Sequence, residues 1–317
     1  MKKSNNTLLA LLLVFLAFAC DDIFEEDISN DILQIISPIE GETIQGNTVQ
    51  FSWQNLDGAD GYRIQVINAN HIYEVDSLVS VSTLVYILNP GEYQWRIRAE
   101  NFAYTSPYTF PVNFTIVISD DLSDQTVALH TPSDNFYTNN TNIIFTWNEI
   151  ISADYYNIEI IKKFNGQQTV FQQSAITVTN LNIDPNTFDE DAEYIWKIKA
   201  LNSISETTYS ERSVFIDRVI PSQPLLVSPL DQETESTAIN FNWTNGVDLG
   251  NVKSVITNKI DIATDIDFNS IIHSANTTNN TYQFEFDTVG TYFWRIKAID
   301  AATNESDYSN VRTVVVQ

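Results

Sequence analysis

The spacing of tryptophan constrains this chain more than any other feature. Six tryptophans form two series of three, and neighbouring members of each series lie 94 to 101 residues apart. The first series is Trp53, Trp147 and Trp243, and the second is Trp95, Trp196 and Trp294. A period of this length indicates one domain repeated three times in tandem.

Both series lie in alternating sequence, which predicts β-strands. The first tryptophan of each repeat closes a run such as Val49-Gln-Phe51-Ser-Trp53, and the second lies in a run such as Tyr93-Gln-Trp95-Arg-Ile97. Apolar residues at every second position share one face of a strand. No stripe with a helical period follows residue 35, so we expect little helix.

The repeated motifs resemble those of fibronectin type III domains. Each copy has tryptophan on its second strand, a third strand such as Tyr62-Arg-Ile64-Gln-Val66, and a sixth strand of the form Tyr-x-aromatic-x-Ile-x-Ala. The last copy departs from this pattern, because Asn258 stands where its third strand should have the tyrosine. The segment Leu88 to Tyr93 matches the approach to that family's tyrosine corner. The resemblance implies an all-β chain of three tandem immunoglobulin-like (fibronectin type III-like) β-sandwiches. We expect these domains at residues 34–118, 126–217 and 221–317.

The first residues are typical of a secretory signal peptide. Lys2 and Lys3 precede an apolar run that ends at Phe18, and residues 1–19 are therefore expected to be removed. Cys20, the only cysteine in the chain, ends a segment that resembles a bacterial lipobox. The resemblance implies that Cys20 carries lipid and joins the protein to a membrane. Alternatively, Cys20 is only a small apolar residue of the signal sequence.

An acidic segment follows, and residues 20–33 are interpreted as the lipidated cysteine and its tether. It resembles the export signal of flavobacterial-type surface lipoproteins, which implies an outer-membrane location facing the cell exterior. The alternatives are a solvated tether without a signal, and a periplasmic orientation. The net charge is −25 and becomes two units more negative without Lys2 and Lys3. Such a chain is repelled by phosphates, so nucleic acid is excluded as a partner.

The paired tryptophans are predicted to fill the sandwich cores. The two sheets of a sandwich lie about 10 Å apart, and large aromatic side chains span that gap. The alternative is that some indole rings form platforms on which sugars stack. No disulfide can form within the chain, so burial alone must hold each domain.

A strip of basic residues follows the outward face of each sixth strand. Its members are Arg96, Arg98, Lys197, Lys199, Arg295 and Lys297. In the fibronectin-like arrangement the third strand lies beside it and carries Glu159 and Asp261, which favours simple neutralisation across the strands. The alternative is recognition of an acidic polymer. In the first repeat the third strand carries Arg63 near Arg96 and Arg98 and has no acid, so Arg63, Arg96 and Arg98 are candidate ligand contacts.

An aromatic loop follows the sixth strand of the first repeat. Phe102 and Tyr104 lie in this loop, and loops at the ends of a sandwich often carry recognition. These two residues are candidate contacts that could stack on sugar or peptide. The alternative is that they cover the end of the core or start the last strand.

Residues that would carry catalysis or hold a cofactor form no recognisable pattern. His71, His130 and His273 lie at non-equivalent places in different repeats, which gives no zinc motif. No nucleotide-binding glycine motif occurs. Asp261, Asp265 and Asp267 are interpreted as a strand and turn, with a calcium site as the alternative. We therefore expect no catalytic residues, no metal and no cofactor.

The sequence thus predicts a lipid-anchored surface protein that binds or adheres, or serves as a spacer, rather than an enzyme. Its partner is expected to be a glycan or a protein, whose identity the repeat does not reveal because this fold hosts many activities. The alternative function is a structural subunit of an outer-membrane complex, for example a nutrient-uptake system.

Overall fold

The computed structural model describes residues 25–317; the expected signal peptide, Cys20 and the first tether residues lie outside the described part. The chain divides into two compact units between Ser119 and Asp120, the first with one β-sandwich and the second with two. Within residues 25–317 all regular structure is strand, apart from the 3₁₀ turn η2 (Pro185–Thr187). None of the described helical segments is long and apolar enough to cross a membrane.

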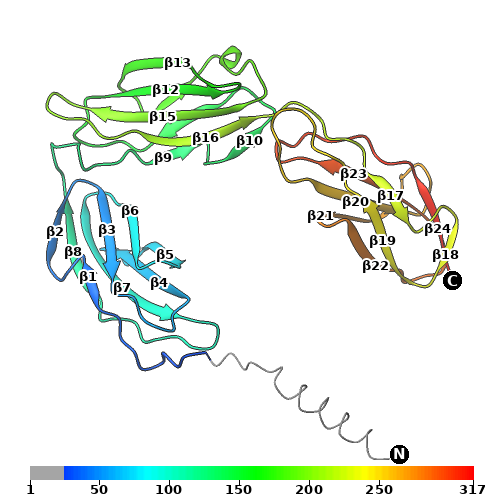
Figure 1. Ribbon diagram of the computed structural model, residues 1–317, viewed down its shortest axis with the longest axis horizontal. Coiled ribbons are helices and arrows are strands. Elements are labelled where there is room, and N and C mark those ends of the chain that lie inside the picture. Colours follow the sequence, from blue (N-terminus) through cyan, green and yellow to red (C-terminus); the bar gives the residue numbers. More distant parts are fainter. Residues whose placement is uncertain (1–24) are drawn as a thin grey trace, which may run out of the picture. The chain divides into compact units, whose positions relative to one another are not determined.

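The first sandwich packs a three-stranded sheet on a five-stranded sheet (Figure 1). The smaller sheet has the order β1 (Ile35–Ser37), β3 (Thr48–Trp53), β6 (Thr83–Ile87). The larger sheet has the order β2 (Glu42–Gln45), β8 (Val112–Val117), β7 (Gly91–Glu100), β4 (Gly61–Asn68), β5 (Tyr73–Val79).

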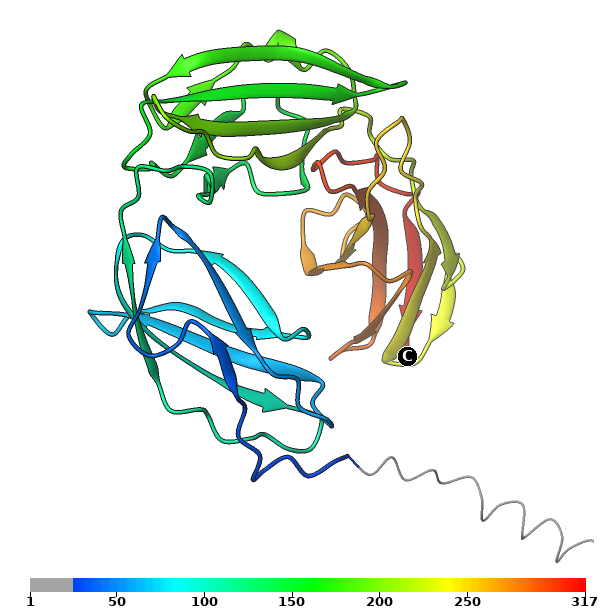
Figure 2. The same cartoon turned by 60° about the vertical axis from the view of Figure 1, so that its left-hand side comes forward.

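The second sandwich repeats this strand order. Its smaller sheet is β9 (Leu129–Thr131), β11 (Ile144–Trp147), β14 (Asn180–Asn182). Its larger sheet is β10 (Phe136–Thr138), β16 (Ser210–Ile216), β15 (Glu193–Leu201), β12 (Tyr155–Lys163), β13 (Gln167–Ile176). Figure 2 shows the long strands of the larger sheet as one layer of this sandwich.

The third sandwich has the same order again. Its smaller sheet is β17 (Leu225–Ser228), β19 (Ala238–Thr244), β22 (Thr281–Glu285). Its larger sheet is β18 (Glu233–Glu235), β24 (Arg312–Val316), β23 (Gly290–Ile299), β20 (Thr257–Ala263), β21 (Ile271–Thr277). The chain is therefore all-β, with three tandem immunoglobulin-like sandwiches of fibronectin type III-like strand order.

The third and sixth strands of each sandwich are antiparallel neighbours, as the sequence predicts. They are β4 with β7, β12 with β15, and β20 with β23. The exception to antiparallel pairing is the short strand after each proline turn: β2, β10 and β18 run parallel to the last strand of their sandwich. The first stretch of every repeat thus contributes to both sheets.

The tryptophans lie in the cores between the two sheets. All six are between 0% and 3% exposed. In each sandwich the second tryptophan meets a phenylalanine of the opposite sheet edge to face, at ring-centroid distances of 5.0, 5.1 and 4.9 Å. Edge-to-face aromatic pairs at this separation stabilise a core beyond the area that they bury.

A tyrosine corner closes each sandwich at the start of the sixth strand. The hydroxyls of Tyr93, Tyr194 and Tyr292 donate to the main-chain oxygen four residues earlier, at 2.7, 3.1 and 2.9 Å. The preceding sequences differ, but the corner depends on the tyrosine and on a carbonyl, which every sequence supplies.

The first sandwich begins earlier in the chain than the expected boundary at residue 34. Ile28 is fully buried and Leu33 nearly so, and both belong to the core of this sandwich. The side-chain amide of Asn101 also donates to the main-chain oxygen of Glu26 at 2.9 Å. The described end of the acidic segment, assigned above to the tether, is therefore packed on the domain.

Candidate functional site

A short segment after each sixth strand positions a tyrosine over that strand. The segments read Ser106–Thr109, Thr207–Ser210 and Ser306–Ser309. In the first, the main-chain nitrogen of Ala99 donates to Ser106 Oγ at 2.9 Å, and that of Ile97 donates to Thr109 Oγ1 at 3.2 Å. These two side-chain hydroxyl groups thus accept the hydrogen bonds of β7 main-chain nitrogens that a main-chain oxygen would otherwise accept. Sequence reasoning missed this motif, although its recurrence in all three repeats was a usable signal.

The tyrosine of each segment lies against the basic strip. Tyr108 faces Arg96 and Arg98 at 4.3 and 4.8 Å, Tyr209 faces Lys197 and Lys199 at 4.4 and 5.3 Å, and Tyr308 faces Arg295 and Lys297 at 3.7 and 5.2 Å. A cation within about 6 Å of an aromatic ring is attracted by the negative face of that ring. Every sandwich therefore holds its basic strip against a ring.

In the second sandwich a carboxylate completes this arrangement. Lys197 Nζ lies 2.8 Å from Glu159, which is its partner across β12 and β15. The hydroxyl of Tyr209 donates to the same carboxylate at 2.8 Å. Burial and this hydrogen bond raise the pKa of Tyr209 to about 12. The cross-strand neutralisation predicted for Glu159 is confirmed.

The third sandwich has the same arrangement of tyrosine, cation and acid, but its acid, Asp261, is more deeply buried than Glu159. Asp261 is 1% exposed, accepts from the hydroxyl of Tyr308 at 2.6 Å and lies 3.6 Å from Arg295. Burial and the hydrogen bond to Asp261 raise the pKa of Tyr308 to about 12. Asp261 thus pairs with Arg295 across β20 and β23, as predicted, and also lies 3.8 Å from Lys259.

The first sandwich has an amide where the other two have a carboxylate. Gln65 lies opposite Arg96 across β4 and β7, and its Oε1 accepts from Arg96 Nε and Nη2 at 2.9 and 2.7 Å. An amide oxygen satisfies the donors of a guanidinium without neutralising its charge. Among residues 25–317, no ion pair involves Arg96.

The other two candidate arginines are paired. Arg63 lies 3.1 Å from Asp76 on β5, and Arg98 lies 2.7 Å from Glu100. The third strand carries no acid for Arg63, and its partner Asp76 lies on the fourth strand, whose register does not follow from the sequence. We call Arg63, Arg96, Arg98 and Tyr108 the arginine face; its uncompensated charge lies on Arg96.

A hollow of about 230 Å³ lies beside Arg96. It is lined by Gln65, Ile67, Tyr73, Gln94, Trp95, Arg96 and Pro111. Two amides, an exposed tyrosine and a guanidinium thus surround one depression. Such a set can donate to carboxylate or sulfate oxygens and can hydrogen-bond hydroxyl groups.

The aromatic loop next to the arginine face points its phenylalanine into solvent. Phe102 is 93% exposed and Tyr104 is 37% exposed, and Phe110 on the same connection is 88% exposed. The loop is held from below, because Asn101 Oδ1 accepts from the main-chain nitrogens of Ala103 and Tyr104 at 3.2 and 2.7 Å. Phe102 does not cover the core, which was one alternative interpretation of this loop.

The remaining sequence candidates are part of the structure of their sandwiches. Asp265 accepts from the main-chain nitrogens of Asp267, Asn269 and Ser270 at 3.1, 3.1 and 2.7 Å, which is a turn. His273 Nε2 lies 2.7 Å from the hydroxyl of Tyr282 and its ring packs on Phe284. The lipid attachment predicted at Cys20 falls outside residues 25–317.

Comparison with known proteins adds a distant structural likeness. No protein-family model matches the chain, and a search of curated proteins finds no match. Among solved structures, the chain is similar to the chicken CNTN1 FN1-FN3 domains, with 15% identity and a TM-score of 0.46, over 90% of this chain and 97% of that one. The strand order described above, rather than this likeness, defines the class: three tandem fibronectin type III-like sandwiches.

Proposed function

We propose that this protein is a lipid-anchored, outward-facing surface protein of the outer membrane that binds ligand without catalysis, through the arginine face of its first sandwich. The observation that carries the proposal is the difference at one equivalent position. Lys197 and Arg295 face carboxylates, whereas Arg96 faces an amide. A cation left without a counter-charge beside a hollow is available to a ligand.

The chemistry of this face favours an acidic glycan. A guanidinium binds carboxylate or sulfate through two parallel hydrogen bonds, and the exposed rings of Phe102 and Phe110 can stack on sugar rings. The chain as a whole is acidic, but fields from distant charges are screened beyond about 8 Å at physiological ionic strength. The arginine face can therefore act on a ligand that touches it.

A glycan array with purified residues 21–317 tests the proposal. We expect binding to glycans that carry carboxylate or sulfate and none to their neutral counterparts. Arg96→Gln should weaken binding at least tenfold, because a hydrogen bond to a charged group contributes roughly 1.5–3 kcal/mol. The matched control is Lys197→Gln, at the equivalent position of the second sandwich. Equal binding by the wild type and Arg96→Gln would refute the role of this face.

The aromatic loop gives a second, independent variant. Phe102→Ser combined with Tyr104→Ser removes the exposed rings and leaves the hydrogen bonds of Asn101 in place, because those go to main-chain groups. Under the proposal the double variant loses glycan affinity with an unchanged melting temperature.

The alternative function is a spacer or structural subunit of an outer-membrane complex. The closed ion pairs of the second sandwich support it, because Lys197 with Glu159 and Lys199 with Glu206 leave the strip of that sandwich neutral. A blank array combined with co-purification of one outer-membrane protein at fixed stoichiometry would favour this function over ligand binding.

The anchor is tested separately from the ligand. Labelled palmitate should enter the wild-type chain and not Cys20→Ser, and protease added to intact cells should degrade the wild-type protein. Labelling that survives Cys20→Ser, or protection from protease, would contradict the anchor or the outward orientation respectively.

A further inference from the structure

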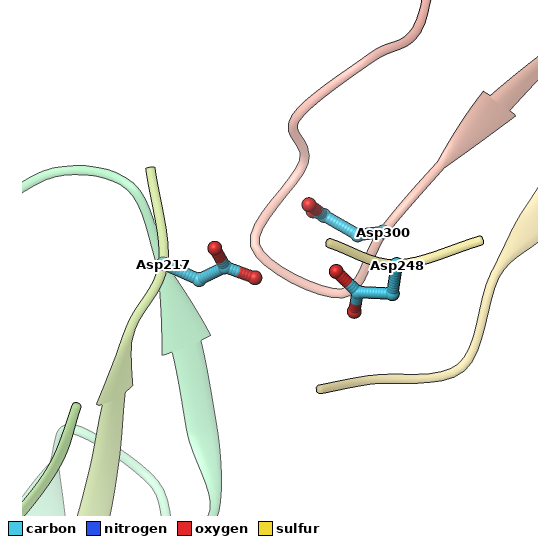
Figure 3. Close-up of side chains that lie close together, drawn as sticks. All are labelled: Asp217, Asp248 and Asp300. Atoms are coloured by element: carbon cyan, nitrogen blue, oxygen red, sulfur yellow. The ribbon is translucent and has the colours of Figure 1, made fainter. Parts of the chain in front are cut away.

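Three aspartates from distant parts of the sequence meet where the third sandwich begins. Asp217 follows β16, Asp248 lies in the loop between β19 and β20, and Asp300 follows β23 (Figure 3). Each offers one carboxylate oxygen, and these three oxygens lie within 4.8 Å of one another. Figure 3 shows the carboxylate of Asp217 directed towards the other two.

The cluster is buried and incompletely bonded. Asp217, Asp248 and Asp300 are 0%, 7% and 5% exposed. Asp217 Oδ2 and Asp248 Oδ1 have no hydrogen-bond partner. Within residues 25–317 none of the ion pairs involves any of the three. Two buried carboxylate oxygens thus lack a donor, a costly state for a folded protein. The nearby ammonium group of Lys253 donates to the main-chain oxygen of Asp248 at 2.6 Å and to neither of these oxygens.

The electrostatics around Asp217 agree with this geometry. Burial, reinforced by the negative charges of Asp300, Asp248 and Asp191, raises the pKa of Asp217 to about 6. Like charges this close in a buried site disfavour ionisation. A bound cation would remove that penalty and satisfy the unpartnered oxygens together.

Hydrogen bonds within the surrounding loops fix the positions of the aspartates. The main-chain nitrogen and Oγ of Ser254 lie 2.6 and 3.0 Å from Asp248 Oδ2, and the main-chain nitrogen of Ala301 donates to the same Oγ at 3.0 Å. Asn304 donates to Asp300 Oδ2 at 2.8 Å and to the main-chain oxygen of Asp217 at 2.9 Å. These bonds occupy one oxygen of Asp248 and leave the other facing the cluster.

Comparison with the second sandwich identifies two sequence differences that create the aspartate cluster of the third. Asn202 occupies the place of Asp300 directly after the sixth strand, and Trp147 to Tyr156 spans nine positions where Trp243 to Asn258 spans fifteen. The six additional residues form the loop that supplies Asp248 and Ser254. An insertion and an acidic substitution therefore converge on one point of the fold.

We infer that Asp217, Asp248 and Asp300 bind a calcium ion that ties the linker after the second sandwich to two loops of the third. Calcium takes oxygen ligands at 2.3–2.6 Å, so three oxygens within 4.8 Å of one another can share one calcium ion. Magnesium keeps several of its waters and is usually bound by only one or two carboxylates, which a buried cluster of three carboxylates does not favour. This site is separate from the arginine face and does not depend on it.

Terbium(III) luminescence and calorimetric titration with calcium, on residues 21–317 freed of metal, test the inference. We expect one ion per chain, calcium displacing terbium, and magnesium binding at least tenfold more weakly than calcium. Asp217→Asn and Asp248→Asn should each reduce calcium affinity at least tenfold. The control is Asp287→Asn, an exposed acid of the same sandwich, which should bind as the wild type does.

The melting temperature separates a metal ligand from a merely structural aspartate. Without calcium, Asp217→Asn should melt higher than the wild type, because it removes repulsion and keeps the oxygen that accepts from Val219. With calcium the order should reverse. An Asp217→Asn variant that melts lower in both conditions, calcium binding that survives both substitutions, or equal affinity for magnesium would overturn the inference.

Discussion

The second and third sandwiches share a core but begin differently. In both, an asparagine from the loop after the sixth strand donates to the main-chain oxygen of an aspartate at the start: Asn202 to Asp120 at 2.7 Å and Asn304 to Asp217 at 2.9 Å. The second sandwich then buries Leu122 completely. The third instead turns the carboxylate of Asp217 inwards. The same hydrogen bond thus occurs at the start of both sandwiches. The start of the second sandwich packs an apolar side chain, whereas that of the third packs acids.

The largest expected effect tests whether the two cores are equivalent. Trp196→Ala and Trp294→Ala should each destabilise their own sandwich by roughly 3–5 kcal/mol, because both indoles are fully buried and leave a cavity. Hydrogen exchange measured on peptides of β15 and β23 localises the loss. A loss below about 1 kcal/mol for either variant would show that the equivalence of the cores is wrong.

The second prediction compares the apolar residues at the start of the second and third sandwiches. Leu122→Ala should cost the second sandwich about 2–4 kcal/mol, because Leu122 lies in its core. Val219, two residues after Asp217, is only half-buried, so Val219→Ala should cost roughly 1 kcal/mol. Hydrogen exchange in β16, β15 and β23 reports both changes. Equal losses would mean that the joint of the third sandwich is apolar after all.

The shared architecture could be predicted from sequence because it depends on large side chains that recur at regular intervals. Tryptophan and tyrosine recur at fixed depths in the repeat, and a period of two with turn residues between runs leaves few arrangements other than a sandwich. Even the tyrosine corner was partly visible, at Leu88 to Tyr93. These features follow from residues that are near one another in the chain.

The aspartate cluster could not be predicted in the same way. Asp217 and Asp300 are separated by most of a domain, and in an acidic chain no single aspartate stands out. Two signals existed: an acid at the place of Asn101 and Asn202, and the longer interval from Trp243 to Asn258. Their meaning required knowing that both loops meet the linker. The same limit concealed Asp76, whose pairing with Arg63 depends on the register of β5.

A third prediction concerns a clamp that the two sandwiches share. Arg212 donates to the main-chain oxygens of Leu129, His130 and Pro132, and Arg312 donates likewise to Leu226, Val227 and Pro229. The first sandwich has no such arginine, and there the indole of Trp95 donates to Pro38 at 3.0 Å.

Replacing either arginine with methionine keeps much of the side-chain volume and removes all three bonds. Arg212→Met and Arg312→Met should each cost about 1–3 kcal/mol, because partly buried carbonyls lose a charged donor. Exchange at β9 and β17 should increase in the matching variant only. An unchanged β9 in Arg212→Met would show that water replaces the donor at no cost.

The smallest effect sharpens the contrast between the second sandwich and the first. Glu159→Gln places in the second sandwich the amide that the first has at Gln65. The hydrogen bond from Lys197 holds the pKa of Glu159 below its usual value of 4.5. Since the folded pKa is lowered, the stabilisation by this pair is present above pH 4.5 and is lost as the pH falls through the folded value.

At neutral pH the variant should therefore lose up to about 1 kcal/mol, because a partly exposed ion pair contributes little more. The difference from the wild type should shrink as the pH is lowered from 6 to 3.5, measured as exchange protection of β12 and β15. Glu149→Gln, an exposed acid of the same sandwich, is the control. A difference that stays constant with pH would mean that Lys197 is held by the ring of Tyr209 rather than by the carboxylate, and that an amide opposite Arg96 does not by itself leave its charge available.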